Sequence, residues 1–141
     1  MYEGLIFAII AAVTFGVWTV FHKYASGSIN NLFGAIVVSL TAVVVGLIFL
    51  LPKLKDTVLF TSSKGIIFAV LAGVCALAID FFALKAYSTG MPIAVAGPII
   101  LGGSVAISAI IGFFVGDTIT FLRVLGVLLI TAGAAILGAL G

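Results

Sequence analysis

The sequence is poor in charged residues. Of its 141 residues, six are Lys or Arg and four are Asp or Glu, so only 7% are charged while 65% are hydrophobic. About a quarter of the residues in an ordinary soluble domain carry a charge. A soluble domain with this composition would expose large apolar patches. The composition therefore excludes a soluble globular protein. With a net charge of only +2, we also expect no nucleic-acid partner.

Residues that carry chemistry are scarce as well. The single cysteine, Cys75, can form no intrachain disulfide, and we interpret it as a small apolar packing residue. No cluster of His, Cys and carboxylates has metal-ligand spacing, and no P-loop or dinucleotide fingerprint is present. Gly102-Gly103 lacks the preceding strand and the following Lys of a phosphate loop. We therefore expect no metal, no cofactor and no enzymatic activity.

Long apolar stretches fill almost all of the chain. Each has about 20 residues, which is enough for a helix to cross the hydrocarbon core of a bilayer. They run over residues 5–24, 32–51, 65–85, 92–115 and 121–140. Strands of a membrane barrel would have about 10 residues of alternating polarity, and no such pattern occurs. The sequence predicts an all-α bundle of five transmembrane helices, forming a single domain over residues 1–141 of a multi-pass protein in the cell membrane.

The basic residues in the connections bear on orientation. Short connections make consecutive helices antiparallel neighbours, so five spans place the two termini on opposite sides. The side of the N-terminus carries four basic residues and the other side carries two: Lys53, Lys55, Lys64 and Arg123 against Lys23 and Lys85. This difference favours a cytoplasmic N-terminus under the positive-inside rule. Moving two residues would remove the bias, so a fixed orientation and a dual topology both stay open.

A family resemblance begins at the end of the third stretch and extends over the chain. The segment from Phe81 to Gly138 contains Ala83-Leu84-Lys85-Ala86-Tyr87, Pro98, Gly116-Asp117, Gly126 and Gly133. It resembles the closing half of an EamA-type domain of the drug/metabolite transporter superfamily. There, a helix ending in a pattern like A-L-K-Y-x-S-A precedes a Pro-containing helix, a Gly-Glu turn and a last helix with G-x-x-L-I-x-x-G. Gly16-Val17-Trp18 with Lys23 is similar to the first helix of that family, and Asp117 replaces the usual Glu.

The resemblance implies a transporter that moves a small organic solute by alternating access. Most members carry two such domains, and this chain looks like one domain alone. Transporters commonly place inverted repeats around a site at mid-membrane. A lone five-helix unit recreates that symmetry only as an antiparallel homodimer. Small multidrug transporters of the same superfamily are four-helix proteins that resemble this dimeric arrangement. A parallel dimer, a monomer and a larger complex are the alternatives.

Two stripes of small residues are candidates for the contact between copies. Gly126 and Gly133 lie seven residues apart on one face of the last helix. This spacing is similar to the glycine heptad that serves dimerisation in small multidrug transporters. Membrane helices associate by close packing of small residues. The fourth helix carries a second stripe at four-residue spacing: Ser104, Ser108, Gly112 and Gly116. Alternatively, both stripes pack helices within one chain.

Asp80 is the main candidate for a substrate-binding residue. It lies about two turns from the end of the third helix in an otherwise apolar run, and ionisable residues in a membrane are costly and usually face the interior of the bundle. Gly73, Ala76, Leu84 and Tyr87 share its helical face. Asp80 is expected to bind substrate or a proton, to pair with Lys23, or to stay neutral and hydrogen-bonded.

The first helix offers a second set of candidates. Thr14, Trp18 and His22 recur at four-residue intervals beside Lys23. Trp18 and Tyr87 near a carboxylate would suit a cationic or aromatic substrate. As alternatives, Trp18 and Tyr87 belong to the aromatic belt at the membrane interface, and His22 and Lys23 extend to the headgroups. The first helix lacks the acidic residue that small multidrug transporters use for proton coupling, which argues against proton-coupled export of cationic drugs.

The fourth helix adds Pro98 and Ser104 to the candidate substrate site. Gly97-Pro98, followed by Gly102-Gly103, predicts a kink. Irregular backbone at membrane depth is tolerated where it is buried in protein or lines a cavity. Two other classes of function compete with transport. An assembly or accessory subunit would need no cavity, and an intramembrane enzyme would need a second reactive group beside Asp80 or His22.

Overall fold

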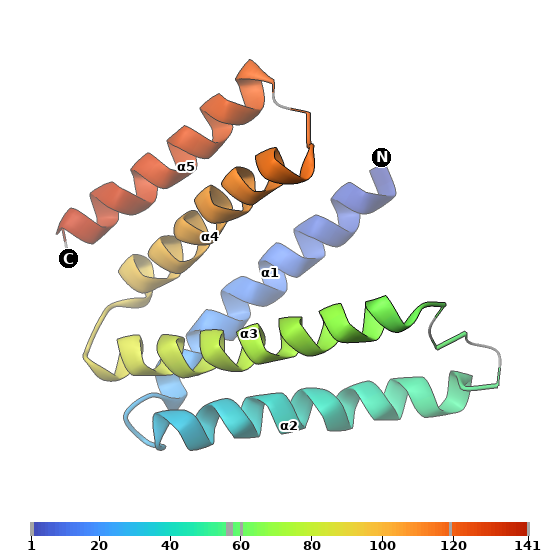
Figure 1. The fold of residues 1–141 in the computed structure, drawn as a ribbon. Coiled ribbons are helices and arrows are strands. Elements are labelled where there is room, and N and C mark those ends of the chain that lie inside the picture. Colours follow the sequence, from blue (N-terminus) through green and yellow to red (C-terminus); the bar gives the residue numbers. More distant parts are fainter. Residues whose placement is uncertain (1, 56–57, 60, 119, 141) are drawn as a thin grey trace. The chain divides into compact units, whose positions relative to one another are not determined.

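Five long helices make up the protein in a computed structural model that describes residues 2–140 apart from residues 56, 57, 60 and 119 (Figure 1). They are α1 (Tyr2–Ala25), α2 (Asn31–Leu50), α3 (Ser63–Ser88), α4 (Ile93–Val115) and α5 (Phe121–Leu140), and a short 3₁₀ helix, η1 (Leu51–Lys53), follows α2. Within the described residues, all five long helices are long and apolar enough to cross a membrane. The predicted all-α membrane fold is confirmed. Compared with the predicted stretch 65–85, α3 extends two residues further at its start and three at its end.

The chain divides into two compact units. The terminal unit comprises residues 1–23 and 86–141, and the central unit comprises residues 24–85. The terminal unit therefore contains α1, the last turn of α3, α4 and α5. The central unit contains α2, η1 and most of α3. The division falls inside α1, between Lys23 and Tyr24, and inside α3, between Lys85 and Ala86.

In the terminal unit, α4 and α5 run antiparallel and lie side by side (Figure 1). They lie close together at Gly102, where an added Cβ would lie 2.5 Å from the Cβ of Ala134 and 3.4 Å from the Ile130 carbonyl oxygen. Further along, Gly138 faces the side chain of Ile99, 3.2 Å from such a Cβ. Small residues let membrane helices approach closely, since lipid provides no hydrophobic drive for association. Glycine and alanine thus allow the close approach of α4 and α5.

The C-terminal end of α4 is capped by hydrogen bonds to carbonyls of its own last turn. Gly116 has φ 96°, the left-handed conformation that glycine adopts at little cost. The Asp117 amide donates to the Gly112 carbonyl at 3.0 Å and the Gly116 amide to the Phe113 carbonyl at 3.3 Å, which together form a Schellman motif. The Asp117 carboxylate rests on Gly112, where an added Cβ would lie 2.8 Å from Oδ2. Gly112 and Gly116 of the predicted stripe therefore serve the end of their own helix.

In the central unit, α2 and α3 meet at one end of the helical hairpin. Asn30 caps α2, because its Oδ1 accepts from the amides of Leu32 and Phe33 at 3.0 and 3.2 Å. An added Cβ on Gly34 would lie 2.8 Å from Cδ1 of Leu84. Ala35 and Ala83 are also buried at this end.

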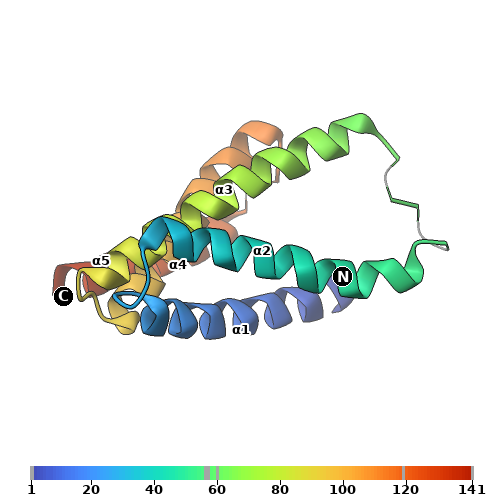
Figure 2. The same ribbon diagram turned by 90° about the horizontal axis from the view of Figure 1, so that it is seen from below.

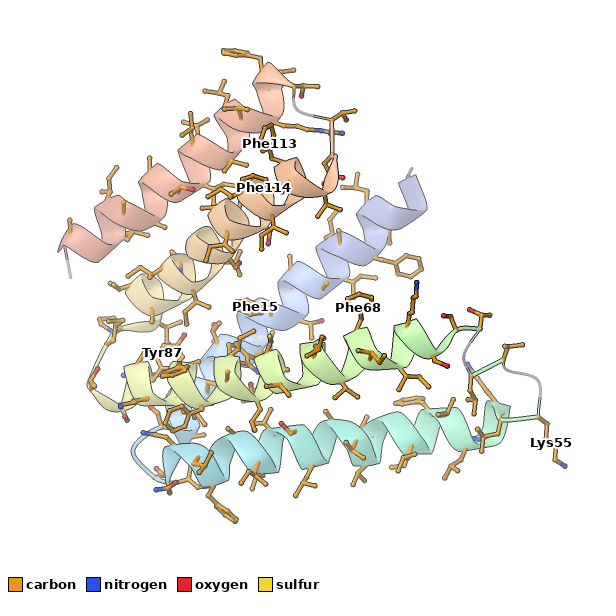
Figure 3. The ribbon with its side chains drawn as sticks, viewed as in Figure 1. Phe15, Lys55, Phe68, Tyr87, Phe113 and Phe114 are labelled. Atoms are coloured by element: carbon orange, nitrogen blue, oxygen red, sulfur yellow. The ribbon has the colours of Figure 1, made fainter. Side chains whose placement is uncertain are left out.

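Toward η1 the helices α2 and α3 diverge (Figure 2). There the aromatic side chains project outward, since Phe49 is 70% exposed and Phe68 is 69% exposed. Apolar side chains also project outward along the other helices (Figure 3), including Phe114 at the end of α4. Such side chains suit contact with lipid. The thiol of Cys75 is free and exposed on α3.

Candidate functional site

The terminal unit contains a cavity of about 550 Å³ between α1, α4 and α5. Phe15, Gly16 and Thr19 line it from α1, Gly97 and Pro98 from α4, and Gly133 from α5. Sites for small molecules commonly measure about 300–1,000 Å³ and are lined mostly by apolar groups. The cavity therefore has the volume and the apolar lining of a small-molecule site, and it lies among helices that are long and apolar enough to span the membrane. It is open to the outside, since Leu129 and Ile130 of its lining are 64% and 49% exposed.

Thr19 supplies the polar side chain of this cavity; the other described lining residues are apolar or glycine. It is 5% exposed, and its hydroxyl donates to the Gly16 carbonyl at 2.7 Å. Sequence reasoning missed Thr19 because it followed the more polar face of α1. The available signal was Gly16, a small residue on the face that also carries Ala12, Phe15 and Thr19 at helical spacing.

Pro98 changes the backbone of α4 at the cavity wall. Proline has no amide hydrogen, so the Ala94 carbonyl receives no hydrogen bond from position 98. The helix nevertheless runs without a break from Ile93 to Val115. Gly97 and Pro98 are both half-buried and line the cavity. Because Gly97 has no side chain, its backbone forms part of the wall here.

Aromatic rings stack along α1 toward its C-terminal end. The centroids of Phe15 and Trp18 lie 5.0 Å apart, and those of Trp18 and His22 lie 3.7 Å apart. His22 is 3% exposed, and its Nδ1 lies 3.1 Å from the Trp18 carbonyl oxygen. The structure therefore brings together two members of the predicted four-residue series. The third, Thr14, is exposed and donates to the Ile10 carbonyl at 2.8 Å.

Lys23 joins the end of α1 to the connection between α3 and α4. Its Nζ donates to the carbonyl oxygens of Tyr87 at 3.3 Å and Met91 at 3.0 Å. The chain reverses here through Gly90, which has φ 95° and donates its amide to Tyr87. A cation at the C-terminal end of a helix is stabilised by the helix dipole and by the open carbonyls. Sequence reasoning did not assign this role to Lys23, because the carbonyls of a turn leave no trace in the residue types.

Tyr87 is the largest fully buried side chain of the described residues, with 1% exposure (Figure 3). Its hydroxyl makes no hydrogen bond of good geometry with any described residue. The Thr19 side chain lies beside it. A buried hydroxyl is normally hydrogen-bonded, and Thr19, which lines the cavity, is the neighbour able to form such a bond.

Asp80 and Ser104 are the remaining candidates. Asp80 is 7% exposed on α3 and belongs to the central unit, whereas His22 and Lys23 belong to the terminal unit. Ser104 is exposed on α4, donates to the Leu101 carbonyl at 2.8 Å and does not line the cavity. Within the described residues, no three or more His, Cys, Asp and Glu side chains gather in a way that could hold a metal ion.

The glycines predicted to join two copies are not used to pack the chain against itself. A Cβ added to Gly126 or Gly133 would meet no atom within 4 Å among the described residues. The close approach of α4 and α5 uses Gly102 and Gly138 instead. Gly133 has a further role that its spacing did not indicate, because it lines the cavity.

Comparison with known proteins extends over both units. The model of the EamA-like transporter family matches residues 2–139. Searches of curated proteins and of solved structures found no match. Five membrane-spanning helices agree with a half-size member of that family. The chain therefore belongs to the EamA-like transporter family and is a multi-pass membrane protein.

Proposed function

We propose that this protein moves a small organic solute across the cell membrane by alternating access, as an antiparallel homodimer, and that it is not an enzyme. The observation that carries this proposal is the cavity of about 550 Å³ between three membrane-spanning helices. A subunit that only supports assembly needs no such space. Membership of a transporter family agrees with a transport role.

The open glycine face of α5 supports the homodimer. Gly126 and Gly133 leave room for another helix, since nothing lies within 4 Å of a Cβ added at either position. A second copy with the opposite orientation would provide the inverted repeat that transporters use. Because Gly133 also lines the cavity, a helix docked on this face would lie next to the solute path.

Asp80 is proposed to bind a proton or a cationic group of the solute during transport. It is buried in α3, and an ionisable group in a membrane span is costly unless it has a function or a partner. We also propose that Trp18, His22, Tyr87 and Pro98 contribute to the solute path. The exposed hydroxyls of Thr14 and Ser104 are proposed to reach the solute only in the dimer.

Uptake by proteoliposomes tests this function. The wild-type protein is expected to take up at least one solute from a panel of amino acids, nucleosides and organic cations. Asp80→Asn keeps the shape of the side chain and removes its charge, and should lower that uptake about tenfold or more, the loss of roughly one strong interaction. Asp117→Asn, in the link between α4 and α5, is the matched control and should retain uptake.

Two outcomes would contradict the proposal. Full uptake by Asp80→Asn would remove Asp80 from the mechanism. Absence of uptake for every solute, together with a stoichiometric partner that co-purifies from native membranes, would favour an accessory subunit.

Labelling of single cysteines tests the antiparallel arrangement. Ser28→Cys and Thr61→Cys lie in the two connections that flank α2, so each is expected on a different side of a single copy. In a Cys75→Ala background, an impermeant maleimide should label each position from both faces of the membrane. Labelling of each position from one face only would exclude opposite orientations.

A further inference from the structure

The cavity of the terminal unit is suited to an uncharged solute. Of its described lining residues, Thr19 carries a polar side chain and none carries an ionisable one. An ion that leaves water for an apolar wall needs a compensating charge, whereas an uncharged polar group needs only a hydrogen bond. The wall can satisfy an uncharged polar group with a hydrogen bond but offers no charge to an ion, so the cavity favours neutral ligands.

The Thr19 hydroxyl is able to change its partner. It donates to the Gly16 carbonyl at 2.7 Å, an oxygen that in an α-helix also accepts the amide hydrogen four residues later. Gly16 therefore stays satisfied when Thr19 turns away. A hydroxyl has one donor and two acceptor lone pairs, so Thr19 can donate to a group in the cavity and still accept from another side.

The Tyr87 hydroxyl is the group that can donate a hydrogen bond to Thr19. Its hydroxyl is buried without a hydrogen bond of good geometry to any described residue, and Thr19 is the side chain beside it. Leaving a buried donor unsatisfied is unfavourable. If the Thr19 hydroxyl turns toward a solute, Tyr87 can donate to the lone pairs of Thr19 that this rotation presents. Consecutive hydrogen bonds of this kind strengthen one another.

We propose that the cavity binds an uncharged, largely apolar solute with one hydrogen-bond acceptor, that Thr19 donates to this acceptor, and that Tyr87 positions the Thr19 hydroxyl. This inference rests on the proposed transport function and names the chemical class of the solute. Because the solute is uncharged, it leaves the proton as the ligand of Asp80. Tyr87 acts through Thr19 and is a positioning residue, since its own hydroxyl is covered.

The only tryptophan of the chain serves as a built-in reporter. Trp18 stacks at 5.0 Å on Phe15, which lines the cavity. Its fluorescence is followed while purified protein is titrated with three probes that share one apolar cage. Methyl adamantane-1-carboxylate is neutral and has an ester acceptor, adamantane-1-carboxylate is an anion, and adamantan-1-ylammonium is a cation. We expect saturable binding of the ester and binding of both ions at least about tenfold weaker.

Variants of Thr19 test the hydrogen bond. Thr19→Val should weaken binding of the ester about fivefold, the usual effect of one hydrogen bond, and Thr19→Ser should recover most of it. Thr41→Val is the matched control, because Thr41 on α2 also donates to a carbonyl of its own helix, at 2.8 Å to Val37. It should bind the ester like the wild type.

Tyr87→Phe separates positioning from a structural role. It should weaken binding of the ester about two- to fivefold in the wild-type background and cause no further loss in Thr19→Val. Its melting temperature should not fall, because the variant removes an unsatisfied buried donor. A lower melting temperature with unchanged binding of the ester would assign Tyr87 a structural role and overturn the positioning proposal.

Filling the cavity distinguishes this site from partition into detergent or lipid. Gly16 lines the cavity and has nothing within 4 Å of an added Cβ, so Gly16→Leu should abolish saturable binding of the ester. Gly4→Leu, an equally open position of α1 outside the cavity lining, should not. Binding that survives Gly16→Leu, or equal binding of ester and ions, would overturn the inference.

The binding assay and the uptake assay together separate this inference from the proposed function. Uptake of a charged solute by a protein that does not bind the ester would leave transport standing and refute the neutral-solute site. Binding of the ester by a protein that takes up no solute would leave the site standing and refute transport.

Discussion

The two antiparallel helix pairs of the chain, α4–α5 and α2–α3, are built differently. In α4–α5 the contact involves Gly102 against Ala134 and, further along, Gly138 against Ile99. In α2–α3 the close contact of Gly34 with Leu84 lies at one end, and the helices diverge toward η1. The middle of α2 carries valines at positions 43, 44 and 45, and all three are exposed. Small residues at the crossing decide which apolar helices stay together in lipid.

The difference in packing between the two helix pairs suits the two units to different roles. The tight pair forms two walls of a cavity, and glycine and proline in those walls bring the backbone to its surface. The looser pair contains the buried carboxylate of Asp80 near its contacting end. A rigid frame suits a site that must keep its shape, whereas helices with few mutual contacts open at low cost. The glycines and lysines of the two units offer direct ways to test this contrast.

The largest effect is expected from the face of α5 that carries Gly126 and Gly133, the second of which also lines the cavity. If Gly126 and Gly133 join two copies, replacing both with Leu should lower the yield of crosslinked dimer about tenfold or more, because the added side chains force the backbones apart. The chain itself should still fold, since both positions are open within it. Gly46→Leu combined with Gly73→Leu, two equally open positions in the central unit, is the control. An unchanged yield would move the interface away from this face.

The next largest effect should come from the crossing of α4 and α5. At Gly102 an added methyl group would meet the Cβ of Ala134 at 2.5 Å, and an alanine side chain has no rotamer that could yield. Gly102→Ala should therefore destabilise the protein by about 1–3 kcal/mol, measured by unfolding in mixed micelles. A stability equal to that of the wild type would show that α4 and α5 separate as readily as α2 and α3.

Lys23 should matter more than Lys85, the lysine near the end of the central unit. Lys23→Met keeps the apolar stem but removes the hydrogen bonds to the carbonyls of Tyr87 and Met91. The loss is expected to be about 1–2 kcal/mol, because the bonds are charge-assisted and the side chain is half-buried. Lys85→Met, at an exposed position 6.0 Å from the Phe81 ring centroid, should cost about 0.5–1 kcal/mol. Equal losses in the two variants would contradict this ranking.

The smallest effect is expected at the contact of α2 with α3. At Gly34 an added methyl group would meet Cδ1 of Leu84 at 2.8 Å, and that atom is the end of a flexible side chain. The strain is offset by the lower chain entropy that alanine gives the unfolded state. Gly34→Ala should change stability by less than about 1 kcal/mol, in the same assay as Gly102→Ala. A larger loss than at Gly102 would reverse the comparison of the two pairs.

The fold could be predicted from the sequence because it depends on the length and polarity of the apolar stretches. The site could be predicted only in part, because α1, α3 and α4 are apolar nearly all round and their sequences do not indicate which face turns inward. Polarity pointed to Thr14, Trp18 and His22, and the rings of Trp18 and His22 do come together. The cavity uses the neighbouring face with Phe15 and Thr19. That choice depends on how α1 is rotated about its own axis.

The sequence also could not show what each glycine does. The regular spacing of Gly126 and Gly133 singled them out, and the spacing of Gly112 and Gly116 suggested a second stripe. The structure uses Gly102 for the crossing of α4 and α5, and it uses Gly112 and Gly116 to end α4. Spacing alone cannot separate these uses, because each requires the same absence of a side chain.

The ammonium group of Lys23 also imposes an order on synthesis. Its carbonyl partners stand 64 and 68 residues later in the chain. Because the ribosome delivers the N-terminal part first, α1 is synthesised before these two bonds can form. During that interval Lys23 counts toward the charge bias that orients the first span. The same ammonium group later links the end of α1 by hydrogen bonds to Tyr87 and Met91, which are synthesised later.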